Sequence, residues 1–223
     1  EGGRHPLPAV ETLERTFSAW GIDSLVQVVV YDNGGGGYAA RLWWMLRYLG
    51  HSHVALLDGG YPAWVKANLP LVKGQESRKS RSFKPEVQEG MLAEVKEVLL
   101  SINDKNKLLI DSRSPERYQG LQESIDRLAG HIPGAANRFW QHNLDEDGYF
   151  LPKATLQKEW LALLQTAPPE SSIVQCGSGV TGCQYILAMT HAGLEGARLY
   201  PGAWSHGLEE PELPMVLGPK QET

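Results

Sequence analysis

The sequence predicts an α/β fold of two tandem domains, each a parallel sheet flanked by helices. The first observation is an internal repeat. Residues 28–60 and 172–202 both run from an apolar stretch through a small-residue turn and a helical stretch to a second apolar stretch and a glycine-containing turn. The second observation is the spacing, because Gly50 and Gly193 lie 143 residues apart, as do the glycines of the two final turns. This order is typical of βαβ units, and the matched positions favour duplication over chance resemblance.

A polar segment without periodicity, residues 73–82, indicates a linker between the two copies. We therefore expect a first domain over residues 1–72 and a second over residues 83–223. The second domain has 93 residues before its cysteine, Cys176, whereas the first has 31 residues before the matching turn at Asp32. This difference predicts that the first domain lacks its N-terminal part, and that Glu1 is not the native start of the protein.

The remaining elements follow from hydrophobic periodicity and from turn residues. In chain order we expect strands at 28–31 and 54–57 joined by a helix, a helix over 91–102, a strand at 107–111, a turn at 130–135, a helix over 153–164, and the strand, helix and strand of residues 172–202.

Composition limits the function. The 223 residues carry a net charge of -5, which gives no electrostatic reason to expect nucleic acid or an anionic membrane surface as a partner. The apolar runs are too short to span a bilayer. Cys176 and Cys183 are too few for a disulfide scaffold or a cysteine-rich zinc site, and on one helix they would lie about 10 Å apart, too far for a disulfide. The seven histidines form no H-x-x-x-H metal pair, and we expect neither a metal nor another cofactor.

Cys176 is the best candidate for chemistry, because it lies where a buried strand meets a small-residue turn that opens into a helix. Unpaired N–H groups and the helix dipole at such a position stabilise a thiolate. The turn can form an anion-binding nest from the amides of Gly177, Ser178, Gly179, Val180 and Thr181. The alternative is a small buried residue that ends a core strand. The first copy has Asp32 at this place, so only the second half can perform thiol chemistry.

Three other classes of site fit the cysteine segment poorly. Residues 177–182 match G-x-G-x-x-G, but only 41 residues follow, too few for the strands that a dinucleotide-binding domain still needs. A cysteine phosphatase needs an arginine six positions after its nucleophile, where this chain has Gly182. The G-x-S-x-G elbow of serine hydrolases is not present at Cys176.

Five segments together resemble the two-domain rhodanese-type sulfurtransferases, and the resemblance covers nearly the whole chain. They are residues 41–45, 57–60, 111–113, 130–135 and 176–181. The cysteine loop is of the kind associated with 3-mercaptopyruvate sulfurtransferases. The resemblance implies two rhodanese-like domains, of which the first is inactive and the second is catalytic, in agreement with the repeat.

The implied reaction moves sulfane sulfur from 3-mercaptopyruvate through a cysteine persulfide on Cys176 to a thiol or cyanide, and releases pyruvate. The neutral residues Gly177 and Ser178 favour mercaptopyruvate over dianionic thiosulfate as the donor. Two alternatives stay open: a thiosulfate:cyanide sulfurtransferase, and a module that relays sulfur between proteins. A thioredoxin-like reductant is a further acceptor to consider, and we expect the cytoplasm as the compartment.

The resemblance also implies roles for individual residues. Ser178 matches the serine that hydrogen-bonds the substrate carbonyl and helps to protonate the leaving carbon, although its hydroxyl can instead satisfy a turn amide. Arg117 and Arg127 match the arginines that bind the substrate carboxylate, with Arg113 as a weaker candidate. His5 matches the first-domain histidine that relays protons with the serine, and the aspartate that would orient it falls upstream of residue 1.

Overall fold

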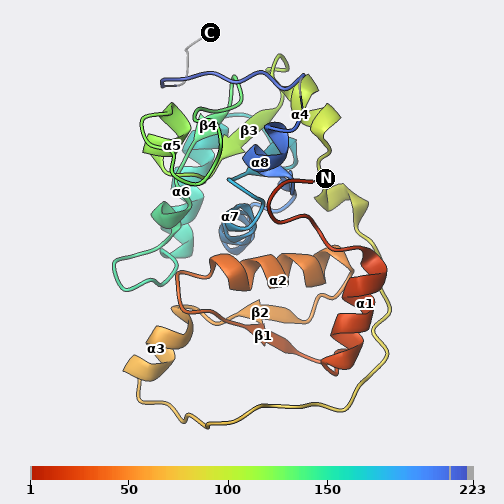
Figure 1. The fold of residues 1–223 in the computed structure, drawn as a ribbon. Coiled ribbons are helices and arrows are strands. Elements are labelled where there is room, and N and C mark those ends of the chain that lie inside the picture. The colour runs from red at the N-terminus through yellow and green to blue at the C-terminus, as the bar shows by residue number, and fades with distance from the viewer. Residues whose placement is uncertain (1, 211, 220–223) are drawn as a thin grey trace.

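Two parallel β-sheets lie on either side of a pair of packed helices in the computed structural model, which describes residues 2–210 and 212–219 (Figure 1). The smaller sheet pairs β1 (Val28–Val30) with β2 (Val54–Leu56). The larger has the order β4-β3-β5-β6, with β3 (Leu108–Asp111), β4 (Ala136–Asn137), β5 (Ser172–Gln175) and β6 (Arg198–Leu199). All pairs within both sheets are parallel, which confirms the predicted α/β class.

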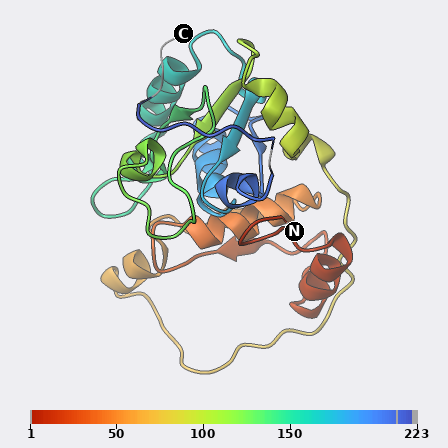
Figure 2. The same cartoon turned by 45° about the horizontal axis from the view of Figure 1, so that its top comes forward.

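Each copy of the repeat forms a βαβ unit around one of the two packed helices. In the first copy α2 (Gly37–Tyr48) connects β1 to β2, and in the second α7 (Thr181–His191) connects β5 to β6. Figures 1 and 2 show α2 lying directly against α7, between the two sheets. The remaining helices are α1 (Val10–Ala19), α3 (Gly60–Lys66), α4 (Val95–Ser101), α5 (Pro115–Gln119), α6 (Lys153–Leu164) and α8 (Ala203–Gly207), with short 3-10 turns at Glu89–Met91, Trp140–Asn143 and Pro169–Ser171. None of the described helices is long and apolar enough to cross a bilayer.

One hydrophobic core runs through both copies. Trp44 and Leu46 of α2 are fully buried in the same cluster as Tyr185 and Met189 of α7. A second cluster covers the other face of the larger sheet and includes Trp204. The two copies therefore share an interior and do not each enclose a core of their own.

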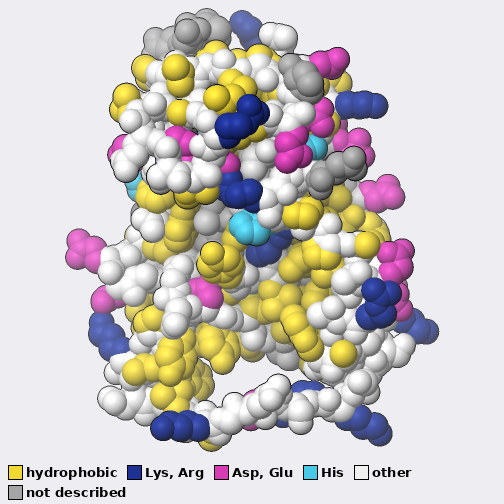
Figure 3. All heavy atoms as spheres, in the orientation of Figure 1, with side chains coloured by type: hydrophobic (Ala, Val, Ile, Leu, Met, Phe, Trp, Pro, Cys, Tyr) yellow, Lys and Arg dark blue, Asp and Glu magenta, His cyan; other side chains and the backbone are white. Residues whose placement is uncertain are grey.

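The smaller sheet is only partly covered. Val29 and Tyr31, at and just after β1, are more than half exposed, and so is Leu71 beyond α3. Figure 3 shows hydrophobic side chains gathered on this lower part of the molecule. The segment between α3 and the turn at residue 89 contains no helix or strand and runs around the outside of the small sheet (Figure 1). It is anchored at its end, where Phe83 is buried and packs edge-on against Phe17 of α1.

Two sequence predictions differ in detail from the structure. The helix predicted over 91–102 begins only at Val95, because Leu92 forms a bridge to Leu199 at the edge of β6 and Glu94 caps the helix through a capping box. The two-residue strand β4 was not predicted, since so short a strand carries no periodic pattern.

We expect acid to destabilise the fold through two buried histidines, His51 and His131. Burial lowers the pKa of both rings, so the unfolded chain binds more protons below its ordinary histidine pKa of about 6.5. The stabilisation is complete above about pH 6.5 and is lost as the pH falls toward the lowered pKa values. We expect the free energy of unfolding, measured with urea between pH 5 and 7.5, to fall less with acid in His131→Gln than in the unchanged protein. His142→Gln, at an exposed ring, is the control. If the free energy of unfolding changes with pH to the same extent in all three proteins, this account is wrong.

Candidate active site

Cys176 lies directly after β5, at the start of the turn that leads into α7. The turn is tightly enclosed. Gly179 has φ +75°, and a side chain there would collide with the carbonyl oxygen of Pro201. Only glycine therefore fits this position without strain. The chain is also fixed from the other side, because the N–H groups of Trp204 and Ser205 donate to the carbonyl oxygens of Cys176 and Gly177.

The backbone of this turn offers donors to an anion. The N–H of Ser178 donates to Cys176 Sγ, with 3.4 Å between nitrogen and sulfur. Over the described ranges of the chain, four neighbouring amides donate to no protein acceptor, those of Gly177, Gly179, Val180 and Thr181. Unpaired N–H groups at the start of a helix form an anion site, so a thiolate or persulfide here has donors available.

The matching turn of the first copy shows how such a loop treats a negative charge. There the Asp32 carboxylate accepts N–H groups from Gly34 at 2.9 Å, Gly36 at 3.0 Å and Ala39 at 2.9 Å. In this copy the N–H groups of the turn are therefore paired with a carboxylate of the chain itself. In the second copy the equivalent position carries a sulfur.

His5 and Ser178 meet across the two halves of the chain. The Nδ1 atom of His5 lies 2.7 Å from Ser178 Oγ, a hydrogen bond that can pass a proton in either direction according to the ring's tautomer. The N-terminal segment is held there because the Arg4 N–H donates to Ser205 Oγ of α8 at 3.0 Å, and Figures 1 and 2 show this segment beside α8.

Two guanidinium groups lie beside the cysteine, those of Arg117 and Arg4. A Cβ added to Gly177 would be 3.1 Å from Arg4 Nη2 and 3.4 Å from Arg117 Nη1, so both side chains face the residue next to the sulfur. Asp126 bridges them, pairing through one oxygen with Arg4 and through the other with Arg117 at 2.7 Å. Arg117 also pairs with Glu123 at 2.9 Å. Burial, followed by the nearby Arg117 charge, lowers the pKa of Arg4, while Cys176 opposes this shift.

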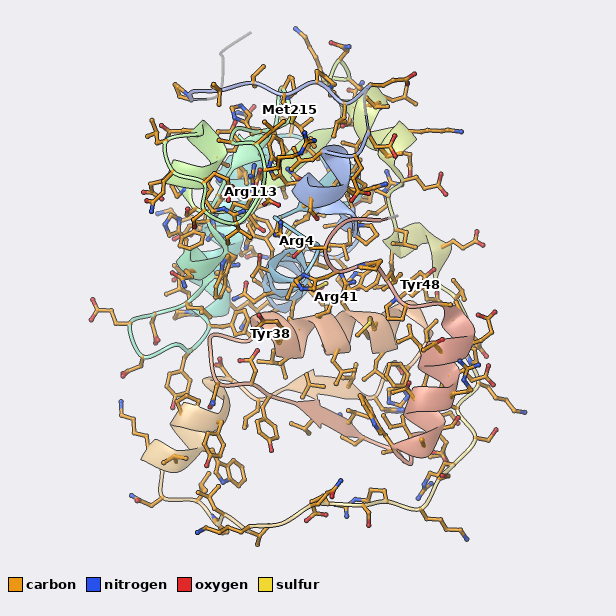
Figure 4. The ribbon with its side chains drawn as sticks, in the orientation of Figure 1. Arg4, Tyr38, Arg41, Tyr48, Arg113 and Met215 are labelled. Atoms are coloured by element: carbon orange, nitrogen blue, oxygen red, sulfur yellow. The ribbon has the colours of Figure 1, made fainter. Side chains whose placement is uncertain are left out.

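Sequence patterns do not predict a role for Arg4, which Figure 4 shows near Arg41. Its partner Asp126 lies 122 residues away, and the one local signal was its position next to His5. Arg127, which was selected, is exposed and donates to the Leu208 carbonyl oxygen at 2.9 Å, so it stays a prediction without a contact at the sulfur. Arg113 is buried in an ion pair with Asp111 at 2.6 Å.

The sulfur itself is well covered. Cys176 is 2% exposed. The side chains of Arg4 and Arg117 beside it are 32% and 19% exposed. A donor that reaches the sulfur must therefore move covering groups.

Comparison with known proteins places the chain in a family. The sequence pattern of the rhodanese-like domain matches residues 1–67 and 94–210. The chain is 40% identical to a probable 3-mercaptopyruvate sulfurtransferase of Pseudomonas aeruginosa, over 97% of this chain and 76% of that protein. It is 36% identical to a putative thiosulfate sulfurtransferase, SseB, of Mycobacterium tuberculosis, with the same two coverages.

Solved structures agree. The 3-mercaptopyruvate sulfurtransferase from Leishmania major superposes with a TM-score of 0.79 at 30% identity, over 95% of this chain and 60% of that one. An anaerobic ergothioneine biosynthesis enzyme from Chlorobium limicola gives a TM-score of 0.84 at 20% identity and shares the fold; this chain covers 56% of its length. On the matched sequence pattern and these identities, the chain belongs to the rhodanese-like domain family.

Proposed function

We propose that this chain is a sulfurtransferase that takes sulfane sulfur from 3-mercaptopyruvate, carries it as a persulfide on Cys176, and passes it to a thiol or cyanide. The proposal rests on one arrangement: a cysteine on a loop of free amides, with the His5–Ser178 pair and the Arg4–Arg117 pair both beside it. The names of the relatives support sulfur transfer from mercaptopyruvate or thiosulfate.

In the first step, the Cys176 thiolate attacks the donor's sulfur. A sulfur–sulfur bond forms, the carbon–sulfur bond of the donor breaks, and its electron pair stays on carbon as the enolate of pyruvate. The enolate then takes a proton from Ser178, which His5 can replace through its 2.7 Å hydrogen bond. In the second step a thiolate or cyanide attacks the outer sulfur, and Cys176 leaves as a thiolate that the loop amides stabilise.

The carboxylate of mercaptopyruvate suits the two arginines, because a planar guanidinium binds a carboxylate through two parallel hydrogen bonds. The charges around them also bear on the donor. Arg4 and Arg117 are already paired with Asp126 and Glu123, so these four side chains together carry no excess positive charge. This balance favours a monoanion over dianionic thiosulfate, which remains the second candidate donor because relatives are named for it.

We also propose that residues 83–223 form the catalytic domain, joined by the linker 73–82 to a domain over 1–72 that has no nucleophile of its own. Asp32 in place of a cysteine supports this division. A thioredoxin-like reductant and a cytoplasmic location fit the second step, because thiol acceptors are kept reduced in that compartment.

Cys176→Ser should abolish turnover with both donors. Mass spectrometry of the unchanged protein after donor treatment should show one added sulfur on Cys176 and none on Cys183. Burial raises the pKa of the Cys183 thiol to about 12, so it stays protonated near neutral pH. Cys183→Ser is the matched control and should keep the label. Sulfur found on Cys183 would contradict the assignment, and a protein that loads sulfur without turning over either donor would point to a relay module.

Arg117→Met and Arg4→Met should each raise the KM for mercaptopyruvate by about 10- to 100-fold, because each loses a charge-assisted hydrogen bond worth about 1.5–3 kcal/mol. Arg127→Met, at the exposed arginine bound to Leu208, should leave KM unchanged. Steady-state kinetics of the three variants show which arginines bind the substrate carboxylate. A rise confined to Arg127→Met would restore Arg127 as the substrate arginine and exclude Arg4.

Ser178→Ala should lower kcat with mercaptopyruvate by about 100-fold, the usual contribution of a positioned proton donor. The kcat with thiosulfate should fall much less, because sulfite departs with its electron pair and no carbon atom has to be protonated. The ratio of the two activities is the measurement. An equal loss with both donors would show that Ser178 supports the loop and does not deliver a proton.

A further inference from the structure

Arg41 of α2 is a buried arginine that the reaction described above does not use. It is 8% exposed, although it belongs to the half of the chain that has no nucleophile. Figure 4 shows it near Arg4, at the junction of α2 and α7. Its Nη1 donates to the carbonyl oxygen of Gly179 at 2.6 Å, and its Nη2 donates to the carbonyl oxygen of His5 at 3.1 Å.

These two acceptors belong to the two backbone segments whose side chains must meet. Gly179 follows Ser178 directly, and the His5 ring lies 2.7 Å from Ser178 Oγ. One guanidinium therefore joins the serine's loop in the second half to the histidine's segment in the first. A guanidinium is planar and rigid, so fixing both carbonyl oxygens on it also fixes the distance between the two segments.

The position is costly for a cation. Within the described ranges of the chain, Arg41 has no carboxylate within ion-pair distance, and a buried charge without a counter-ion is destabilising. Its hydrogen bonds go to two backbone carbonyl oxygens instead. Replacing buried charged groups by hydrophobic residues of similar volume is often neutral or stabilising, so packing alone does not explain an arginine at this position.

We propose that Arg41 is a positioning residue for proton delivery: it holds Ser178 against His5 across the junction between the two halves. This inference rests on the proposed function, because the proton is the one that the pyruvate enolate takes. The competing explanation is that Arg41 only supports the loop around Cys176 through Gly179.

The two explanations differ in how they depend on the donor. Cleavage of mercaptopyruvate needs a proton on carbon, and cleavage of thiosulfate does not. Loss of the His5–Ser178 alignment therefore slows the first donor alone, whereas a distorted cysteine loop slows both.

The experiment measures kcat and KM with each donor, using cyanide as acceptor, for Arg41→Lys and Arg41→Met. Lysine keeps the charge but donates from a single point and cannot hold both carbonyl oxygens, so Arg41→Lys decides the question if Arg41→Met fails to fold. We expect kcat with mercaptopyruvate to fall at least 10-fold more than kcat with thiosulfate, with KM little changed. Arg47→Lys on the same helix is the matched control, and circular dichroism checks the fold of each variant.

A second measurement uses mercaptopyruvate alone. In the Ser178→Ala background, Arg41→Lys should lower kcat less than about 2-fold further, because its effect passes through the serine. Equal losses with both donors, no loss, or full additivity with Ser178→Ala would each overturn the inference. Failure of the proposed function is recognised separately, since the unchanged protein would then form no persulfide on Cys176.

Discussion

Backbone N–H groups at the junction of a strand and a helix are the constraint on which this structure depends. Each copy of the repeat places such a junction at the same point, before α2 and before α7. The first copy satisfies its amides with the Asp32 carboxylate, and the second leaves most of them free beside Cys176. The corresponding loop is therefore a closed turn in one half and an open anion site in the other.

The open loop is completed by the half that lacks a nucleophile. Arg4, His5 and Arg41 all come from the first half, and each contacts a group of the second: Asp126, Ser178 and Gly179 respectively. The contact of α2 with α7 brings Arg41 to the cysteine turn, and the hydrogen bond from the Arg4 N–H to Ser205 Oγ holds the start of the chain there. The candidate site is thus a property of the junction and not of either copy alone.

Local sequence patterns predicted the elements of the fold but not the contacts between distant segments. Apolar runs, glycines and the small-residue turn predicted both βαβ units and the place of Cys176, because strand and helix periods and turn chemistry are local. The resemblance to a family added Ser178, His5 and Arg117, and the structure brings all three to one place. The pairing of Arg4 with Asp126 was not predicted, because the two residues lie 122 positions apart. The loop after α5 has no helix or strand periodicity from which its course could be predicted. The same loop directs Arg127 toward Leu208, which its position in the sequence does not reveal.

The uninterrupted core has a consequence for how the chain tolerates mutation. Trp44 and Tyr185 belong to one apolar cluster, so a cavity created under the small sheet weakens the scaffold of the distant sulfur as well. In the copy without a nucleophile, substitutions are therefore restricted along α2, which packs against α7. Its solvent-facing side tolerates more sequence change. A variant far from the cysteine can reduce the amount of working protein without touching the chemistry.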